Sequence, residues 1–414
     1  MLQPNSTVRS ATNPQSFWAR SNDSGFASSS SSQSDKSMTN HSGITPLHNA
    51  ISIATDSGSF YRSPGAFKIR RRCPPITTAL DLIMSLPDDC LLRVASELSQ
   101  YDLVNMMRCC KRFHDVGSAS SSWKVIDFGD RVVSAEIIMR LIVRGTTVLR
   151  LCGTHIIDPL PENDEHLITK LTHLDATRLS FSTDGKSILT KIVTSSTMLT
   201  HLSLSGCEIT LEIATHLSHI HTLSHLDLSM CSNLTPHHLS LILTKSGRFI
   251  VELNVSCSQV GREGGMVIAT HCSSRLLRLD LSGSAPFDNQ EDSIDDDVVA
   301  AIVKNCPKVF ELVLSDSPKI TDAGFQKLMT LRDLEALSLS RCYGIHPHEY
   351  MNATHLTQLS IFGLISQEGI QTIREELVST TVNDLELALS KVARATPPPH
   401  VSSLWGVKVK PFNC

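Results

Sequence analysis

The chain has 414 residues, enough for two or three domains. Its 37 lysines and arginines nearly balance its 41 aspartates and glutamates, so it lacks the polyelectrolyte character that favours nucleic acid as a partner. The first residues form no apolar targeting core, and no later apolar run is long enough to span a membrane. We therefore expect an intracellular protein whose 12 cysteines are reduced thiols.

Residues 1–79 are poor in leucine and valine and rich in serine, asparagine, threonine and proline. This composition buries too little apolar surface to offset the entropy of an ordered backbone, so we predict a disordered region. Its Thr45-Pro46 and Ser63-Pro64 pairs could be phosphorylated, but such pairs are common in tails of this kind. The basic residues at 68–72 fit a nuclear import signal or a solvated charge run equally well, and we expect a protein of the nucleus and cytoplasm.

A helical pattern follows the tail. It starts at Leu86, where Pro87 suits the first helical position. A second helix is predicted to start at Ser99, whose hydroxyl can cap it, and to stop near Lys111 and Arg112. A segment of about forty residues with this many large apolar side chains cannot form a stable core alone. Either a partner protein or the domain that follows must cover the surplus, and in the second case the segment is a helical cap.

Residues 80–127 resemble an F-box in their Leu-Pro-Asp start, their apolar spacing, the Cys-Lys-Arg-aromatic run at Cys110 to Phe113 and the closing Trp123. F-boxes dock on the S-phase kinase-associated adaptor subunit of cullin-RING ubiquitin ligases. The resemblance therefore implies this adaptor as a partner and, through it, a cullin and a RING subunit. The residues expected to contact the adaptor are Leu86, Pro87, Leu91, Leu92, Leu98, Leu103, Cys110 and Trp123.

After Trp123 one phrase returns along the chain, as in LTHLSLSGC from Leu199 and LEALSLSRC from Leu334. Between Leu174 and Leu385 its second leucine advances by about 26 residues per step, the spacing of leucine-rich repeats. The pattern predicts about ten repeats over residues 128–387. Stacked copies would form an α/β horseshoe, a solenoid with a parallel sheet on its concave face and helices on its convex face.

The concave face is predicted to be small in side chains, polar and open. Residues between and after the leucines face away from the core, because side chains alternate along a strand. Such a surface suits a protein ligand better than a small molecule, which needs a deep apolar pocket. The expected residues are Ser203, Asp227, Asn254, Asp280, Val313, Ser338 and Ser360, with Ser205, Ser229, Ser256, Ser282, Ser315 and Ser340 two positions further on.

No metal, cofactor or catalytic site is expected. The cysteines that recur in or near one phase of the repeat lack Cys-x-x-Cys spacing. The histidines around the third copy divide between a strand and the helix or loop before it, so they should not converge. These residues are Cys207, Cys231, Cys257 and Cys342, and His216, His219, His221 and His225. No phosphate loop, Ser/His/Asp order or reactive-cysteine context stands out.

One step, from Leu279 to Leu312, is longer than the others. The excess lies in an acidic insertion from Ala285 to Asp297. It could bind a basic partner. The alternative, which its composition favours, is a solvated loop whose last aspartates start the next helix.

The C-terminal third narrows the resemblance. PKVFELVLSDS, LEALSLSRCYGI, LTQLSIFGLISQEGIQTIREEL and LWGVKVK are similar to parts of the family of S-phase kinase-associated protein 2, F-box receptors that recruit phosphorylated cyclin-dependent kinase inhibitors. The resemblance implies that a tail, residues 388–414, folds back across the repeats. It also implies that Asp316, Arg341, Tyr343 and Trp405 bind the substrate or a cyclin-dependent kinase regulatory subunit. The alternative for Asp316 and Arg341, which follow adjacent strands at the same phase, is an ion pair at the rim, and Trp405 is expected to anchor the tail on the early repeats. The chain has Cys257 where the family carries a tryptophan and Ala285 where it carries a basic residue.

These features predict the non-catalytic substrate receptor of an SCF (cullin-RING) E3 ubiquitin ligase, which promotes ubiquitination by proximity. Its substrate would be a phosphorylated cell-cycle protein, degraded by the proteasome. Two alternatives stay open. One is an F-box receptor for an unrelated substrate, and the other is a leucine-rich-repeat scaffold or inhibitor that acts without a ligase.

Overall fold

The computed structural model describes residues 80–157, 169–182, 186–231, 233–285, 291–363, 365–384, 390–395 and 403–408. The predicted disordered region, with its Ser/Thr-Pro pairs and basic cluster, lies outside these ranges. The chain divides into two compact units, Met1–Gly43 and Ile44–Cys414, and every described residue belongs to the second.

The first described elements are short helices: α2 (Leu80–Ser85), α3 (Asp88–Glu97), α4 (Gln100–Met107), α5 (Lys111–Gly117) and the 3-10 helix η3 (Ser120–Trp123). Ser99 caps α4 by accepting a hydrogen bond from the backbone N–H of Asp102, as predicted. The prediction that this helix continues to Lys111 is wrong. It ends at Met107, and a new helix begins after Cys110, whose Sγ accepts a hydrogen bond from the N–H of Phe113.

A parallel sheet of 11 strands follows, which confirms the predicted solenoid. Its strands join in register, so that the central leucines of neighbouring repeats, such as Leu202, Leu226 and Leu253, pair directly. The strands are β1 (Val125–Asp127), β3 (Val148–Arg150), β5 (His173–Asp175), β7 (His201–Ser203), β8 (His225–Asp227), β9 (Glu252–Asn254), β10 (Arg278–Asp280), β11 (Glu311–Val313), β12 (Ala336–Ser338), β13 (Gln358–Ser360) and β14 (Thr381–Val382).

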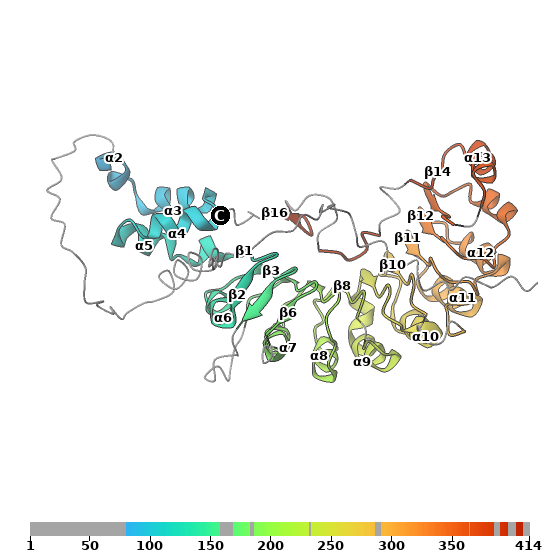
Figure 1. The fold of residues 1–414 in the computed structure, drawn as a ribbon, viewed down its shortest axis with the longest axis horizontal. Coiled ribbons are helices and arrows are strands. Elements are labelled where there is room, and N and C mark those ends of the chain that lie inside the picture. Colours follow the sequence, from blue (N-terminus) through green and yellow to red (C-terminus); the bar gives the residue numbers. More distant parts are fainter. Residues whose placement is uncertain are drawn as a thin grey trace, which may run out of the picture. The chain divides into compact units, whose positions relative to one another are not determined.

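Helices lie along one side of this sheet (Figure 1). They are α6 (Ala135–Val143), α7 (Lys186–Thr194), α8 (Leu211–Leu217), α9 (Pro236–Ser246), α10 (Gly261–His271), α11 (Asp296–Asn305), α12 (Asp322–Leu328) and α13 (Gln367–Glu376), with 3-10 turns η4 (Gly247–Phe249) and η5 (Pro347–Asn352). The end of the acidic insertion has a local role: Asp295 caps α11 and pairs with Arg262. The favoured alternative for these aspartates, starting the next helix, therefore describes them correctly.

Two smaller sheets complete the described chain. One joins β2 (Val132–Ser134), β4 (His155–Ile157) and β6 (Ser180–Phe181) in parallel, and the other is a hairpin of β15 (Ser403–Leu404) and β16 (Val407–Lys408). Neither was predicted, because their strands lie outside the repeated leucine phrase that placed the other short strands.

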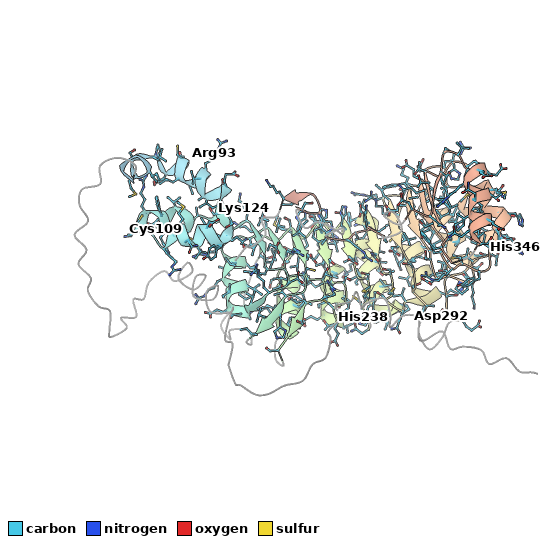
Figure 2. All side chains as sticks on the ribbon, turned by 45° about the horizontal axis from the view of Figure 1, so that its top comes forward. Arg93, Cys109, Lys124, His238, Asp292 and His346 are labelled. Atoms are coloured by element: carbon cyan, nitrogen blue, oxygen red, sulfur yellow. The ribbon has the colours of Figure 1, made fainter. Side chains whose placement is uncertain are left out.

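One contiguous apolar core runs from Leu91 in α3 to Val382 in β14. Gln100 of α4 joins the helices to the sheet, because its side-chain Nε2 donates to the carbonyl of Val125 in β1 at 3.0 Å. The helical segment therefore also caps the first repeat, in addition to whatever its outer side binds. Side chains project on all sides of the described elements, and Arg93 of α3 points away from them (Figure 2). None of the described helices is long and apolar enough to cross a membrane.

Candidate functional site

The predicted adaptor-contact residues divide into a buried and an accessible set. Leu91, Leu103 and Trp123 are 1%, 2% and 2% exposed and belong to the chain's own core. Trp123 also donates a hydrogen bond from Nε1 to the carbonyl of Gly117 at 2.8 Å. In this structure these three cannot touch a partner, which corrects the direct contact expected of them. Leu86 and Pro87 are exposed, and Leu92, Leu98 and Cys110 are partly exposed.

Apolar residues that sequence reasoning did not select are more accessible. Ile83 and Met84 of α2, Val94 of α3 and Tyr101 of α4 are 46%, 44%, 48% and 39% exposed. Together with Leu86, which lies between α2 and α3, they place exposed apolar side chains along the segment α2–α4. We call these five residues the apolar patch. The surplus of apolar residues in this segment predicts that some of them face outward, but it does not identify which ones.

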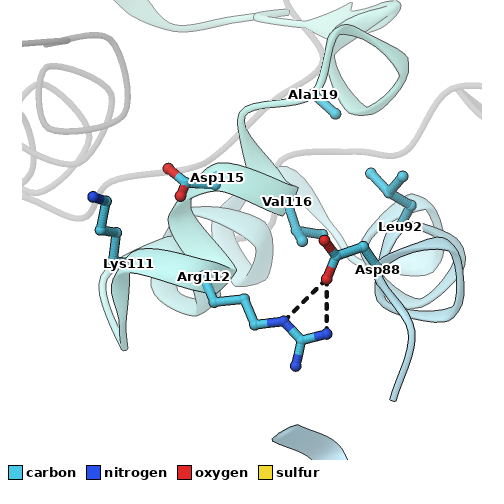
Figure 3. Close-up of a pocket in the computed structure, with 7 residues that line it drawn as sticks. All are labelled: Asp88, Leu92, Lys111, Arg112, Asp115, Val116 and Ala119. Atoms are coloured by element: carbon cyan, nitrogen blue, oxygen red, sulfur yellow. Dashed lines mark hydrogen bonds and ion pairs between the residues drawn. The ribbon is translucent and has the colours of Figure 1, made fainter. Parts of the chain in front are cut away.

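Arg112 fixes the junction between α2 and α3. Its guanidinium donates to the carbonyls of Met84 and Leu86 and to Asp88 Oδ1, with Nε 3.0 Å and Nη2 2.7 Å from that oxygen. A pocket of about 540 Å³ lies beside this contact, lined by Leu92, Val116 and the Asp88–Arg112 pair (Figure 3). Arg112 therefore holds the backbone of Met84 and Leu86, two residues of the apolar patch. The sequence places Arg112 at the end of a helix and does not predict this role.

The polar residues expected on an open sheet surface are mostly buried. Ser203, Asn254 and Asp280 are 0% exposed and Asp227 is 2% exposed. The last residue of several strands accepts a hydrogen bond from the backbone N–H two positions on: Asp227 from Ser229, Asn254 from Ser256 and Asp280 from Ser282. Their role is to satisfy backbone donors at the strand end. The expectation of an open surface is wrong for this part of the sheet.

The described C-terminal segment, residues 390–395 and 403–408, also buries these polar side chains of the sheet. We call this segment the strap. It runs over the sheet from β10 toward β1 (Figure 1). Asn254 Nδ2 donates to the carbonyl of Val392 at 3.1 Å, and the N–H of Ala393 donates to Glu252 Oε2 at 2.9 Å. Leu404 of β15 packs in a small apolar cluster with Val148. Residues 396–402 and 409–414 lie outside the described ranges.

Glu252 holds the strap within an ion-pair row on the sheet. Its carboxylate lies 3.2 Å from Arg278 Nη1 and 3.5 Å from His225 Nε2, and Arg278 also pairs with Glu311 at 3.1 Å. Burial favours a higher pKa for Glu252, but the hydrogen bonds from His225 and the Ala393 N–H, with the charge of Arg278, lower the pKa overall. The carboxylate is thus held ionised beneath the strap.

A row of left-handed residues lies directly after the strands. Its members share positive φ values, and each backbone N–H donates to the next repeat, as from Asp316 to the carbonyl of Ser340 at 2.9 Å. We call it the turn row: Gly206, Met230, Cys257, Gly283, Asp316 and Arg341. Cys257 belongs to this row and is exposed, whereas Cys207, Cys231 and Cys342 are buried one position later. The grouping of Cys257 with the other three cysteines needs this correction.

Asp316 and Arg341 lie side by side in the turn row. Arg341 donates from Nε to Asp316 Oδ1 and from Nη2 to Oδ2 at 2.5 Å, a two-pronged contact that raises the pKa of Arg341. Tyr343 follows and is 67% exposed. Trp405 is not near this group: it lies over His173 and His201 of β5 and β7. The structure therefore brings Asp316, Arg341 and Tyr343 into one region and places Trp405 in another.

The described part of the chain contains no group of histidine, cysteine, aspartate or glutamate residues that could hold a metal ion. Of the four histidines considered together, only His225 is on a strand. His216 is in α8, and His219 and His221 follow that helix.

Two family models match the chain. An F-box-like domain matches residues 83–129, and the SKP2 LRR domain matches residues 136–411.

Solved structures to which the chain is similar include the yeast Rad7–Elc1 complex, with 12% identity and a TM-score of 0.44 over 75% of this chain and 93% of that one. An internalin from Listeria monocytogenes has 15% identity and a TM-score of 0.37 over 64% and 88%. The leucine-rich-repeat protein LegL7 from Legionella pneumophila has 16% identity and a TM-score of 0.35 over 55% and 82%. At these TM-scores the likenesses carry no argument about function.

Proposed function

Because the chain belongs to the family of proteins with an F-box-like domain and a SKP2-type leucine-rich-repeat domain, we propose that it recruits a phosphorylated cell-cycle protein to an SCF ubiquitin ligase. An F-box implies binding to a Skp1-type adaptor and its cullin complex, and an F-box joined to repeats supports substrate recognition in general. This architecture is typical of non-catalytic receptors. The proposed substrate is a protein such as a cyclin-dependent kinase inhibitor, which is degraded after ubiquitination.

The apolar patch is the observation that carries the docking part of the proposal. It lies in the part of the chain that matches the F-box-like domain, beside the Arg112 contact. Other apolar residues of the same helices, such as Leu91 and Leu103, are buried in the chain's own core. Covering exposed apolar side chains releases roughly 25 cal/mol per Å² of buried apolar area. The adaptor is the partner that would cover them.

The group of Asp316, Arg341 and Tyr343 supports the substrate part of the proposal. The planar fork of Arg341 matches a carboxylate or phosphate, and Asp316 holds it in place. The exposed ring of Tyr343 adds an apolar and hydrogen-bonding surface beside it. We propose that the phosphorylated substrate, or a cyclin-dependent kinase regulatory subunit bound to it, binds at this region. The proposed location of the protein is the nucleus and the cytoplasm.

The docking proposal is tested with Val94→Asp in the full chain. Val94 is 48% exposed, so an aspartate there leaves the core unchanged, yet on docking it would bury an unpaired carboxylate at a cost of several kcal/mol. Adaptor binding by calorimetry should weaken at least about a hundredfold.

Val378→Asp is the matched control, because Val378 is 89% exposed and follows α13, far along the chain from α3. It should bind the adaptor like the parent protein. Unchanged binding of Val94→Asp would exclude docking through this surface and would favour a scaffold that acts without a ligase.

A receptor for an unrelated substrate has specific support. Cys257 stands exposed in the turn row where the family carries a tryptophan. Ala285, where the family carries a basic residue, is 8% exposed and offers no charge to a ligand. Capture of partners by the ligase-bound receptor, with and without phosphatase treatment, separates the two substrates.

A further inference from the structure

Three imidazole rings stack across neighbouring strands of the sheet. His173 of β5, His201 of β7 and His225 of β8 occupy the same register position. Ring centroids are 4.3 Å apart for the first pair and 4.0 Å for the second, with interplanar angles of 9° and 17°. The stack follows from the sequence, because consecutive repeats start their strands with histidine. We call these three residues the histidine ladder.

The rings of His173 and His201 are bonded in a way that suits a neutral imidazole, and the Nδ1 side of His225 is bonded in the same way. The hydroxyl of the preceding residue donates to a carbonyl of the previous repeat, at 3.0 Å in all three cases. That hydroxyl can then only accept from the neighbouring Nδ1, which lies 2.8 to 2.9 Å away. Nδ1 therefore carries a proton in each ring. In His173 and His201 Nε2 is left as the site for another, whereas Nε2 of His225 lies 3.5 Å from Glu252. The hydroxyls are those of Thr172, Thr200 and Ser224.

Trp405 of the strap lies against the ladder. Its ring is 5.9 Å from that of His173 and 5.3 Å from that of His201, with angles of 49° and 50°. The indole Nε1 donates to the carbonyl of Ala393 at 3.1 Å, and the backbone N–H donates to that of Ala395 at 3.1 Å. Trp405 thus joins the two described parts of the strap to each other and to the ladder.

The groups around the ladder give His173 and His201 no anion in contact. On one side β9 contributes Glu252, which pairs with His225, and β10 contributes Arg278. On the other side β3 and β1 contribute Val148 and Val125 at the same register. The strap adds two cations: the charge of Lys391 lowers the pKa of Glu311, and that of Arg394 lowers the pKa of Asp227 and Asp280. A proton on the central ring would therefore meet two other histidines, while Glu252, two strands away, favours it without contact.

We propose that the histidine ladder is a proton-operated latch of the strap: protonation of His173 and His201 releases Trp405 and uncovers the sheet between β5 and β8.

The direction follows from linkage. Burial, followed by the charges of His225 and His173, lowers the pKa of His201 to about 3, and burial with His225 also lowers the pKa of His173. A group with a lowered pKa stabilises the covered state fully above its ordinary pKa of 6.5, and this contribution is lost as the pH falls. The part of this lowering that the strap causes weakens covering as the pH falls from about 7.5 to about 5.

Two interactions oppose the latch. A protonated imidazole would be attracted to the face of the indole, and the charge of Glu252 raises the pKa of His201. The protonated ring would also lose hydration and repel the neighbouring ring, and no carboxylate contacts His173 or His201 to offset this. We therefore expect release to win.

The test follows Trp405 by 19F NMR in the full chain labelled with 5-fluorotryptophan. The chain has three tryptophans, and Trp405→Phe assigns the signal. Between about pH 7.5 and about pH 5, the Trp405 resonance should move toward that of a solvated indole. The Trp123 resonance, which reports a ring that is 2% exposed in the core, should stay in place.

His201→Phe keeps a stacked ring that cannot take up a proton, so its Trp405 signal should respond at least about fivefold less over the same range. His201→Gln, which also cannot be protonated, should respond equally weakly. The matched control is His355→Gln, because His355 is exposed and lies outside the ladder. It should respond like the parent protein.

Three outcomes would overturn the proposal. One is a Trp405 signal that moves only together with that of Trp123, which means global unfolding. The others are a full acid response in His201→Phe and a shift of Trp405 toward a more buried position in acid.

Discussion

Arg150 on β3 lies between two acidic residues of the same sheet, Asp127 on β1 and Asp175 on β5. Its Nη1 is 3.1 Å from Asp127 Oδ1 and its Nε is 3.8 Å from Asp175 Oδ2, and the three side chains are 9%, 6% and 1% exposed. Arg150→Ala leaves both carboxylates buried without their cation. Removing one partner of a buried ion pair costs about 3–5 kcal/mol, so we expect the free energy of unfolding to fall by that amount.

The loss should depend on pH. Burial raises the pKa of Asp175, and Arg150 is among the groups that lower it. Without the guanidinium the pKa should rise further above the value in the unfolded chain. A carboxyl group with a raised pKa lowers stability as the pH increases through that pKa. The deficit of Arg150→Ala should therefore be larger at about pH 7.5 than at about pH 5.

Urea unfolding monitored by circular dichroism at both pH values measures this deficit. Arg140→Ala is the matched control, because Arg140 pairs with Glu136 at the surface, where the side chains are 40% and 54% exposed. It should change stability by no more than about 1 kcal/mol. A cost of Arg150→Ala below about 1 kcal/mol, or one independent of pH, would refute the reasoning.

Two further predictions concern the turn row and the cysteines. Arg341→Lys should weaken capture of a phosphorylated inhibitor nearly as much as Arg341→Ala, since lysine keeps the charge but loses the fork, while adaptor binding and melting temperature stay unchanged. Full capture by Arg341→Ala would move the substrate site elsewhere on the repeats. Burial raises the pKa of Cys207 to about 11 and of Cys342 to about 12, so alkylation of the native protein at about pH 8 should modify Cys90 and Cys109 but spare these two. Peptide mass spectrometry measures this, and early labelling of Cys342 would contradict it.

The solenoid could be predicted because its signal is periodic. Leu202, Leu226 and Leu253 occupy the same position in consecutive repeats. Because each repeat contributes one strand, the position of this leucine is enough to locate every strand in the sequence. The F-box helices were also detectable from their apolar spacing. Their outward side was not, because Leu91 and Leu92 are adjacent and both apolar, yet only Leu91 is fully buried.

The burial of the sheet surface could not be predicted from short sequence patterns. The strap reaches Asn254 from 138 positions away in the sequence, and no short pattern encodes such a contact. The hydrogen bond from Ser229 to Asp227 lies within one repeat and could have been anticipated, because aspartate commonly accepts from the N–H two residues on. That signal points to a structural role for the aspartate, and so away from a ligand surface.

The turn row has a consequence for how receptors of this kind could diversify. At each of its positions the backbone is held by a hydrogen bond to the next repeat, as from Arg341 to the carbonyl of Phe362 at 3.0 Å, whichever side chain is attached. A left-handed conformation disfavours side chains other than glycine by about 1–2 kcal/mol, so Met230, Asp316 and Arg341 occupy it at a cost that the rest of the repeat offsets. Exchanging these residues would alter the chemistry shown to a partner while the leucine core keeps its packing. A new binding preference could thus evolve, or be engineered, by single substitutions along one edge of an unchanged framework.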